Sequence, residues 1–216
     1  RDRMTLPTKA QTFRSLHVPG DPLVLYNIWD AGSAVAVARA GAKAIATGSW
    51  SVAAAQGYAD GEEMPLDDAL AVVARILART DLPVTMDFEG GYAAGPAAVS
   101  ANLRRLLALG VAGLNFEDQV VNGPGLYSIE DQVARLRALR LTADELGLQV
   151  FINARTDLFL KAAPEVDHAS LVEEAIARAA AYAAAGADGF FVPGLKDRAL
   201  IRQICDAVTL PVNVMV

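Results

Sequence analysis

The chain has 216 residues, of which 53% are hydrophobic and 20% are charged, and its formal net charge is −6 at pH 7. This length and balance fit one large folded domain and exclude a disordered chain. The acidic balance, without a cluster of Lys and Arg, argues against a nucleic-acid-binding surface. No apolar run reaches the roughly 18 residues of a membrane span, and the polar stretch 1–9 is unlike a signal peptide. We therefore expect no membrane partner and a cytoplasmic location.

Short apolar runs alternate with helix-like segments along the chain, after a short helix expected at 9–17. The runs are typical of strands and lie at 23–29, 42–47, 83–89, 112–117, 149–154, 189–192 and 211–216. The segments between them show helical patterns and lie at 31–40, 66–79, 97–109, 129–146, 171–185 and 198–208. Glycine follows four of these helices, where a left-handed cap is needed, at positions 41, 110, 147 and 186. This alternation predicts a parallel α/β fold.

Two parallel architectures fit this pattern, the open doubly wound sheet and the closed (β/α)8 TIM-type barrel. The doubly wound sheet is disfavoured because residues 29–34 hold one glycine, where a dinucleotide-binding loop has three. The barrel is favoured because six of the seven expected strands deliver polar residues to what would be one rim. We therefore expect a single barrel domain over residues 1–216, truncated at its C-terminal end and lacking the eighth strand and helix.

The third expected strand, 83–89, ends in two acids that are followed by two glycines. Because side chains alternate along a strand, Asp87 and Glu89 are expected on one side of it and in one small space. Such a pair needs a metal ion, an arginine or a shared proton, unless one acid caps a helix and the other is solvated. Glu117 ends the next strand and would join them. Oxygen ligands without a nearby His or Cys select Mg²⁺ or Mn²⁺, which predicts a metal site.

Two further segments offer groups for an anionic substrate. Arg155 follows the fifth strand and supplies a planar cation, or else it forms a structural ion pair with Asp157 or Glu117. Residues 47–49 follow the second strand and offer backbone N–H groups, although a plain turn explains them nearly as well. The single Cys205 lies in an expected helix and is interpreted as structural. A metal beside an arginine suits a small 2-oxo acid that passes through an enolate.

Six short segments follow the order and spacing of a known superfamily. They read NIWDA at 27–31, TGS at 47–49, GYADG at 57–61, DFEGGY at 87–92, GLNFEDQ at 113–119 and NARTD at 153–157. On these segments the chain, from about residue 12 to residue 216, resembles the isocitrate lyase and phosphoenolpyruvate mutase superfamily. The resemblance implies a (β/α)8 barrel with bound Mg²⁺ that forms a homo-oligomer, a dimer or a tetramer.

The resemblance also implies roles for the acids and the arginine. Asp87 would be the main direct metal ligand, with Glu89 and Glu117 acting chiefly through metal-bound waters. Arg155 would contact the oxygens of the substrate. Asp60 would lie near the reacting group, and its alternative is an ordinary Asp-Gly turn.

The expected substrate-binding residues come from the ends of other strands, and they are Trp29, Thr47, Gly48, Ser49 and Asn213. Of these, Asn213 would lie at the far end of the substrate. The chain departs from the superfamily pattern in three places, one of them after the sixth strand, where the lyases tend to have a Glu soon after the Pro and here Pro193 is followed by Gly194. Glu89 stands where an Asp is usual, and the loop 120–126 lacks the Lys, Cys and His that the lyases carry there. Asn122 in this loop is a candidate to reach a transferring group, and otherwise a turn residue.

These observations lead to a hypothesis about function. The chain is expected to be an Mg²⁺-dependent enzyme that makes or breaks a C–C or P–C bond next to a small 2-oxo acid, through a metal-stabilised enolate. This chemistry is similar to that of phosphoenolpyruvate mutase and phosphonopyruvate hydrolase, with a 2-oxo acid or phosphonate as substrate. The alternatives are a C–C lyase of the isocitrate or methylisocitrate type and a homologue that binds metal and a 2-oxo acid without turnover.

Overall fold

Seven parallel strands form one curved sheet in the computed structural model, which describes residues 6–215. The strands are β1 (Asn27–Ile28), β2 (Ile45–Thr47), β3 (Val84–Asp87), β4 (Gly113–Glu117), β5 (Phe151–Arg155), β6 (Gly189–Phe191) and β7 (Val212–Asn213). Each strand pairs with the next one along the chain, in the order β1-β2-β3-β4-β5-β6-β7. A doubly wound sheet would reverse its strand order at a switch point, so the sequential order confirms the barrel-type winding.

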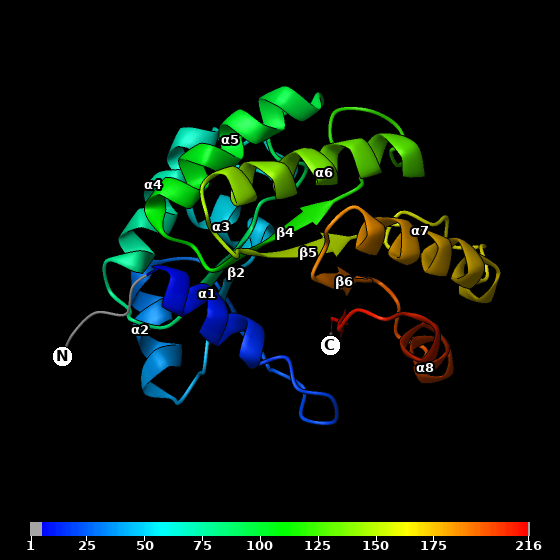
Figure 1. Ribbon diagram of the computed structural model, residues 1–216, viewed down its shortest axis with the longest axis horizontal. Coiled ribbons are helices and arrows are strands. Elements are labelled where there is room, and N and C mark those ends of the chain that lie inside the picture. The colour runs from blue at the N-terminus through cyan, green and yellow to red at the C-terminus, as the bar shows by residue number, and fades with distance from the viewer. Residues whose placement is uncertain (1–5, 216) are drawn as a thin grey trace.

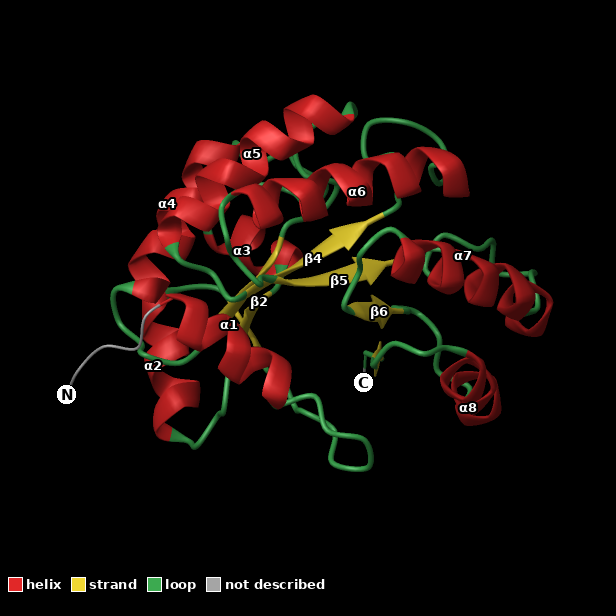
Figure 2. Ribbon diagram, in the orientation of Figure 1, coloured by secondary structure: helices red, strands yellow, loops and turns green. Residues whose placement is uncertain are grey.

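The helices surround the sheet, most of them on its outer side, and the first helix lies on the other side, where its Phe13 packs against Phe151 of β5 (Figure 1). They are α1 (Leu6–Ser15), α2 (Ala31–Arg39), α3 (Ser49–Ala55), α4 (Leu66–Leu77), α5 (Pro96–Leu109), α6 (Ile129–Glu145), α7 (Val172–Ala184), α8 (Arg198–Ala207) and the short 3₁₀ helix η1 (His168–Leu171). Figure 2 shows the strands inside this arc of helices. Within residues 6–215, β1 and β7 are the two edges of the sheet, and no eighth strand joins them. The fold is therefore a TIM-type barrel that lacks its eighth strand, as the sequence predicts.

The alternation of side chains along the strands separates a dry core from a polar interior. Phe116 and Phe190 point outward from the sheet and are fully buried against the helices, where Leu103 of α5 joins them. Asn115, the residue before Phe116 on β4, and Asn153 on β5 point to the inner face of the sheet, where the two side chains hydrogen-bond. The apolar outer layer fixes the register, because a shift by one residue would exchange the two faces.

The ends of several helices carry residues that are typical of helix caps. The glycines after α2, α5, α6 and α7 all adopt left-handed φ angles, of 98°, 97°, 66° and 101°. Pro96 begins α5, and the Ser128 hydroxyl accepts the backbone N–H of Asp131 at the start of α6. No described helix is long and apolar enough to cross a membrane.

Three sequence-based expectations about elements were wrong. The helix α3, at Ser49–Ala55, was not predicted, because its seven residues are too few to show a clear helical period. The first and last strands have two residues each, where runs of seven and six were expected, and Val216 lies outside the described residues. The third strand ends at Asp87, so Glu89 belongs to the following turn, with a left-handed φ of 49°. The alternation argument therefore does not place Glu89 beside Asp87.

Candidate active site

Asp87 lies at the C-terminal end of β3 and is held by the strand beside it. Its backbone N–H donates to Thr47 Oγ1 at 3.0 Å, and its Oδ2 atom accepts the N–H of Ser49 at 3.2 Å. Its other carboxylate oxygen, Oδ1, is buried and has no hydrogen-bond partner among the described residues. A buried carboxylate oxygen without a partner is costly, so this atom is a candidate ligand position.

Thr47 and Ser49 hold Asp87 through these hydrogen bonds, and Gly48 lies between them. The Thr47 side chain is 3% exposed, and the Ser49 N–H is already taken by the carboxylate. A Cβ atom on Gly48 would lie 3.2 Å from Asn27 Cβ, so glycine lets β1 and β2 end close together. The predicted contact between these residues and a substrate remains a prediction.

Glu89 lies beside Asp87 although it is no longer part of the strand. Its Oε1 atom accepts the N–H groups of Gly61 and Glu62, at 3.2 and 3.0 Å, and its Oε2 atom accepts the Tyr92 hydroxyl at 2.9 Å. Burial, and then the charge of Asp87, raise the pKa of Glu89 to about 7. Both carboxylate oxygens therefore have protein donors, and the predicted contact of Glu89 with a metal through water remains a prediction.

Glu117 and Arg155 end the neighbouring strands β4 and β5, where their Cα atoms are register partners. The Arg155 guanidinium lies 3.4 Å from Glu117 Oε2 and 3.6 Å from Asp87 Oδ2. Burial raises the pKa of Glu117 even though the charge of Arg155 acts in the opposite direction. Burial lowers the pKa of Arg155, but the charges of Asp87, Glu117 and Asp157 outweigh it and raise this pKa. These residues form one connected ion-pair group at the rim of the barrel.

A buried network of hydrogen bonds holds the Arg155 side chain in place. Its Nε donates to Asp157 Oδ1 at 2.6 Å, and the Asp157 N–H donates to Asp118 Oδ1 at 3.0 Å. Asp118 is fully buried, and its Oδ2 atom accepts from Arg178 at 3.0 Å and from the Tyr182 hydroxyl at 2.7 Å. The structural ion pair with Asp157 is therefore present, and the guanidinium also faces the two rim acids, whereas the contact of Arg155 with a substrate remains a prediction.

The rim fits a divalent cation by its charge and by its unpartnered oxygen. Within residues 6–215, no three Asp, Glu, His or Cys side chains are arranged to hold a metal ion by themselves. Two of the acids, Asp87 and Glu117, nevertheless lie near Arg155, which is already paired with Asp157, and the buried Glu89 lies beside Asp87. This gathering of carboxyl groups suits Mg²⁺, which is usually held by one or two carboxylates and by several waters.

Three predicted residues lie on exposed loops around this rim. Trp29 follows β1 and is 44% exposed. Asp60 lies in the loop between α3 and α4, close enough to Glu89 for its charge to raise the pKa of that acid. Asn122 is exposed in the turn after β4. The structure thus places Asp60 near the acids, whereas the roles of Trp29 and Asn122 remain predictions.

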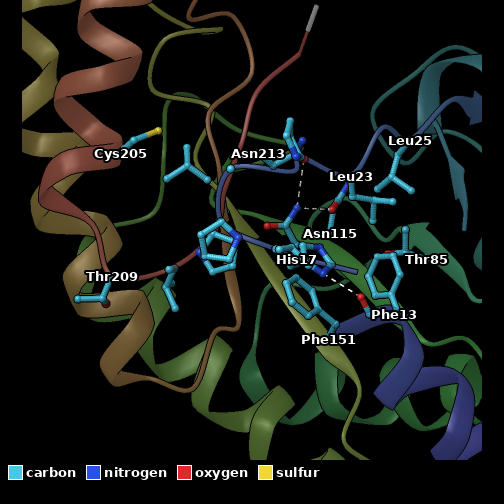
Figure 3. Close-up of a pocket in the computed structure, with 18 residues that line it drawn as sticks. Phe13, His17, Leu23, Leu25, Thr85, Asn115, Phe151, Cys205, Thr209 and Asn213 are labelled. Atoms are coloured by element: carbon cyan, nitrogen blue, oxygen red, sulfur yellow. Dashed lines mark hydrogen bonds between the residues drawn. The ribbon is translucent and has the colours of Figure 1, made fainter. Parts of the chain in front are cut away.

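Asn213 belongs to a row of amides on the inner face of the sheet. Asn153 Nδ2 donates to Asn115 Oδ1 at 2.9 Å and to Asn213 Oδ1 at 3.3 Å (Figure 3). Asn115 and Asn153 stand two residues before Glu117 and Arg155, so they lie one layer below the rim. The row lines a cavity of about 500 Å³ that also contacts His17. Asn213 therefore faces the interior below the acids, and its contact with a substrate remains a prediction.

Arg135 of α6 was missed by the sequence analysis, although its side chain is 2% exposed. Its guanidinium donates to the carbonyls of Gly90, Ala93 and Ala94, which belong to the loop after β3. It also lies 4.1 Å from the ring centroid of Tyr127. Its place on the apolar face of the helix, beside Leu136 and Leu139, was a usable signal, because a charged residue there must find buried partners.

We expect Arg135→Met to lower the free energy of unfolding by about 3 to 5 kcal/mol, because the carbonyl of the buried Gly90 and those of Ala93 and Ala94 lose their donor. Urea denaturation measures this change. Arg137→Met, on the exposed side of the same helix, is the matched control and should change stability by less than about 0.5 kcal/mol. Equal stability of the two variants would contradict a structural role for Arg135.

Comparison with known proteins agrees with the barrel fold. The family model described as phosphoenolpyruvate phosphomutase matches residues 13–216. The chain belongs to this family. Its relatives in the isocitrate lyase and phosphoenolpyruvate mutase superfamily are enzymes, lyases and mutases among them.

Three relatives span almost the whole chain. A candidate phosphonomutase from Burkholderia cenocepacia J2315 is 50% identical, with a TM-score of 0.94, over 98% of this chain and 84% of that one. A 2-methylisocitrate lyase of Escherichia coli K12 is 29% identical over 219 residues, which cover 97% of this chain and 70% of the relative. A 2,3-dimethylmalate lyase structure is 27% identical, with a TM-score of 0.83, over 100% of this chain and 73% of that one.

Proposed function

We propose that this family member is an Mg²⁺-dependent enzyme that makes or breaks a C–C or P–C bond next to the carbonyl of a small 2-oxo acid. The observation that carries the proposal is the buried Oδ1 atom of Asp87, which has no hydrogen-bond partner within residues 6–215 and lies beside two further carboxyl groups. When bound, Mg²⁺ would stabilise the negative charge that develops on the carbonyl oxygen. Mn²⁺ has the same ligand preference and is expected to substitute for it.

The chain's own residues would bind and orient such a substrate. Asp87 would hold the cation directly, while Glu89 and Glu117 would accept hydrogen bonds from its waters. Arg155 presents its remaining N–H groups to the same rim and would bind a carboxylate or phosphonate oxygen. Asp60 would lie near the bond that changes, because its loop is hydrogen-bonded to Glu89.

The loop 120–126 limits which lyase chemistry is supported. It contains no Lys, Cys or His, so it offers no thiol or ammonium group that could give a proton to a leaving carbanion. Names of relatives include 2-methylisocitrate lyase and 2,3-dimethylmalate lyase, so C–C cleavage is one branch of the proposal. A P–C bond change, or a cleavage that needs no donor from this loop, agrees better with the residues present.

The same loop favours a second candidate, a homologue that binds Mg²⁺ and a 2-oxo acid without turnover. A panel of phosphonopyruvate, oxaloacetate, 2-methylisocitrate and isocitrate with Mg²⁺ separates the two candidates. Product formation from a panel member, abolished by EDTA and restored by Mg²⁺, is the expected result. A rise in melting temperature with a panel member, without any product, would contradict turnover and support the binding candidate.

A further inference from the structure

Three residues near the rim share an unusual backbone conformation. Glu62, Glu89 and Tyr92 have φ angles of 61°, 49° and 56°, and among the described residues no other non-glycine residue has a positive φ. Each such conformation costs an L-residue about 1 to 2 kcal/mol, so surrounding contacts must compensate. Two of these residues come from the turn after β3, and the third comes from the loop between α3 and α4.

The three residues hydrogen-bond to one another in a closed ring, which we call the clasp. The Glu62 N–H donates to Glu89 Oε1 at 3.0 Å, and the Tyr92 hydroxyl donates to Glu89 Oε2 at 2.9 Å. The ring closes where the Tyr92 N–H donates to Glu62 Oε1 at 2.9 Å. Every member therefore bonds to both others, and each left-handed backbone places a donor or a carboxylate where the ring needs it.

Two members of the clasp, Glu89 and Tyr92, belong to the turn after β3, which is held by further hydrogen bonds. Arg135 holds the carbonyls of Gly90, Ala93 and Ala94, and Asn102 donates to the Gly91 carbonyl at 2.9 Å. Side chains of α5 and α6 therefore hold the turn after β3, and they do so without the loop between α3 and α4.

The other side of the clasp is a loop with few anchors of its own. Its first part, residues 57–60, is exposed, and the buried side chain of Met64 anchors its end. The Tyr58 hydroxyl donates to Asp68 at 3.0 Å, but both groups are solvent-exposed. Between these points, the Gly61 and Glu62 N–H groups on Glu89, together with the Glu62 carboxylate, tie the loop to the rim.

We propose that the clasp positions Asp60 at the mouth of the barrel, with Glu62 and Tyr92 as the positioning residues. Asp60 directly precedes Gly61, so the two N–H groups on Glu89 fix where its backbone lies. The same contacts hold the Glu89 carboxylate in a single orientation toward Asp87. The effect of the clasp on turnover rests on the proposed function, in which Asp60 lies near the reacting bond.

Glu62→Ala, Glu62→Gln, Tyr92→Phe and the control Glu63→Ala test the clasp by amide hydrogen exchange. Gln keeps an Oε1 acceptor for the Tyr92 N–H, whereas Ala removes it. Glu63 is exposed, carries the same charge and lies in the same loop. We expect amides 59–63 and 92 to exchange at least about tenfold faster in Glu62→Ala and Tyr92→Phe, and near wild-type rates in the other two. Amides of α7 should keep wild-type rates, which shows that the variants remain folded.

Turnover of the best panel substrate is measured on the same four variants. We expect kcat to fall about 10- to 100-fold in Glu62→Ala, with a smaller change in KM, and Glu62→Gln to recover most of it. Wild-type protection of residues 59–63 in Glu62→Ala would overturn the clasp, whatever the activity. Faster exchange with unchanged kcat would overturn the positioning role. If wild type turns over no panel substrate, the proposed function fails, while the exchange data still decide the clasp.

Discussion

Asp87→Ala is expected to abolish Mg²⁺-dependent turnover, with a loss of about 1,000-fold or more. Its Oδ1 atom is buried and has no hydrogen-bond partner in the part of the chain that the structure describes, so alanine removes the position from which the cation would be held directly. Losing about 4 kcal/mol of charge stabilisation in the transition state corresponds to this reduction in rate. Steady-state kinetics of the purified variant, with Mg²⁺ varied, measures the loss.

The matched control for Asp87 is Asp144→Asn, which removes an acid from the exposed surface of α6. Its kcat and its dependence on Mg²⁺ should equal those of wild type. Activity of Asp87→Ala within about tenfold of wild type would contradict the role assigned to Asp87. Circular dichroism should show an unchanged fold, since the surrounding strands keep their backbone pairing.

Replacing Arg155 is expected to affect both stability and activity. Arg155→Met leaves Asp157, which is fully buried, and Glu117 without their cation. Breaking a buried ion pair in this way costs about 3 to 5 kcal/mol, which urea denaturation would detect.

Arg155→Lys keeps the charge but loses the two-point contact with Asp157, at 2.6 and 3.1 Å, so we expect kcat/KM to fall about 100-fold.

Arg202→Lys serves as the control for Arg155, because this arginine is exposed on α8. Its stability and kcat/KM should match wild type. If Arg155→Met unfolds at the wild-type urea concentration, the ion-pair group does not stabilise the barrel. If Arg155→Lys keeps full kcat/KM, the planar guanidinium is not what binds the substrate.

The sequence predicted the winding of the barrel because that information is local and repeated. Apolar runs, helical periods and the glycine caps after four helices all recur along the chain, and the structure contains each of them. Polar residues at the C-terminal ends of adjacent parallel strands lie close together because of the topology. The proximity of Asp87, Glu117 and Arg155 could therefore be predicted from the sequence.

The arrangement around Glu89 could not be predicted from the strand pattern. The strand ends at Asp87, and the turn that follows is fixed by contacts with Glu62, 27 residues earlier, and with Arg135, 45 residues after Gly90. Such long-range hydrogen bonds override the period of two. The helix α3 was missed for a related reason, since its seven residues depend on packing against α4 and β1 rather than on propensity.

Binding of Mn²⁺, followed by electron paramagnetic resonance, tests the central claim most directly because it does not depend on knowing the substrate. Wild-type protein should bind Mn²⁺ and release it when Mg²⁺ is added in excess. Asp87→Ala should bind it at least about 100-fold more weakly, and Asp144→Asn should bind it as wild type does. Equal binding by wild type and Asp87→Ala, or no binding by wild type, would contradict a metal site at the end of β3.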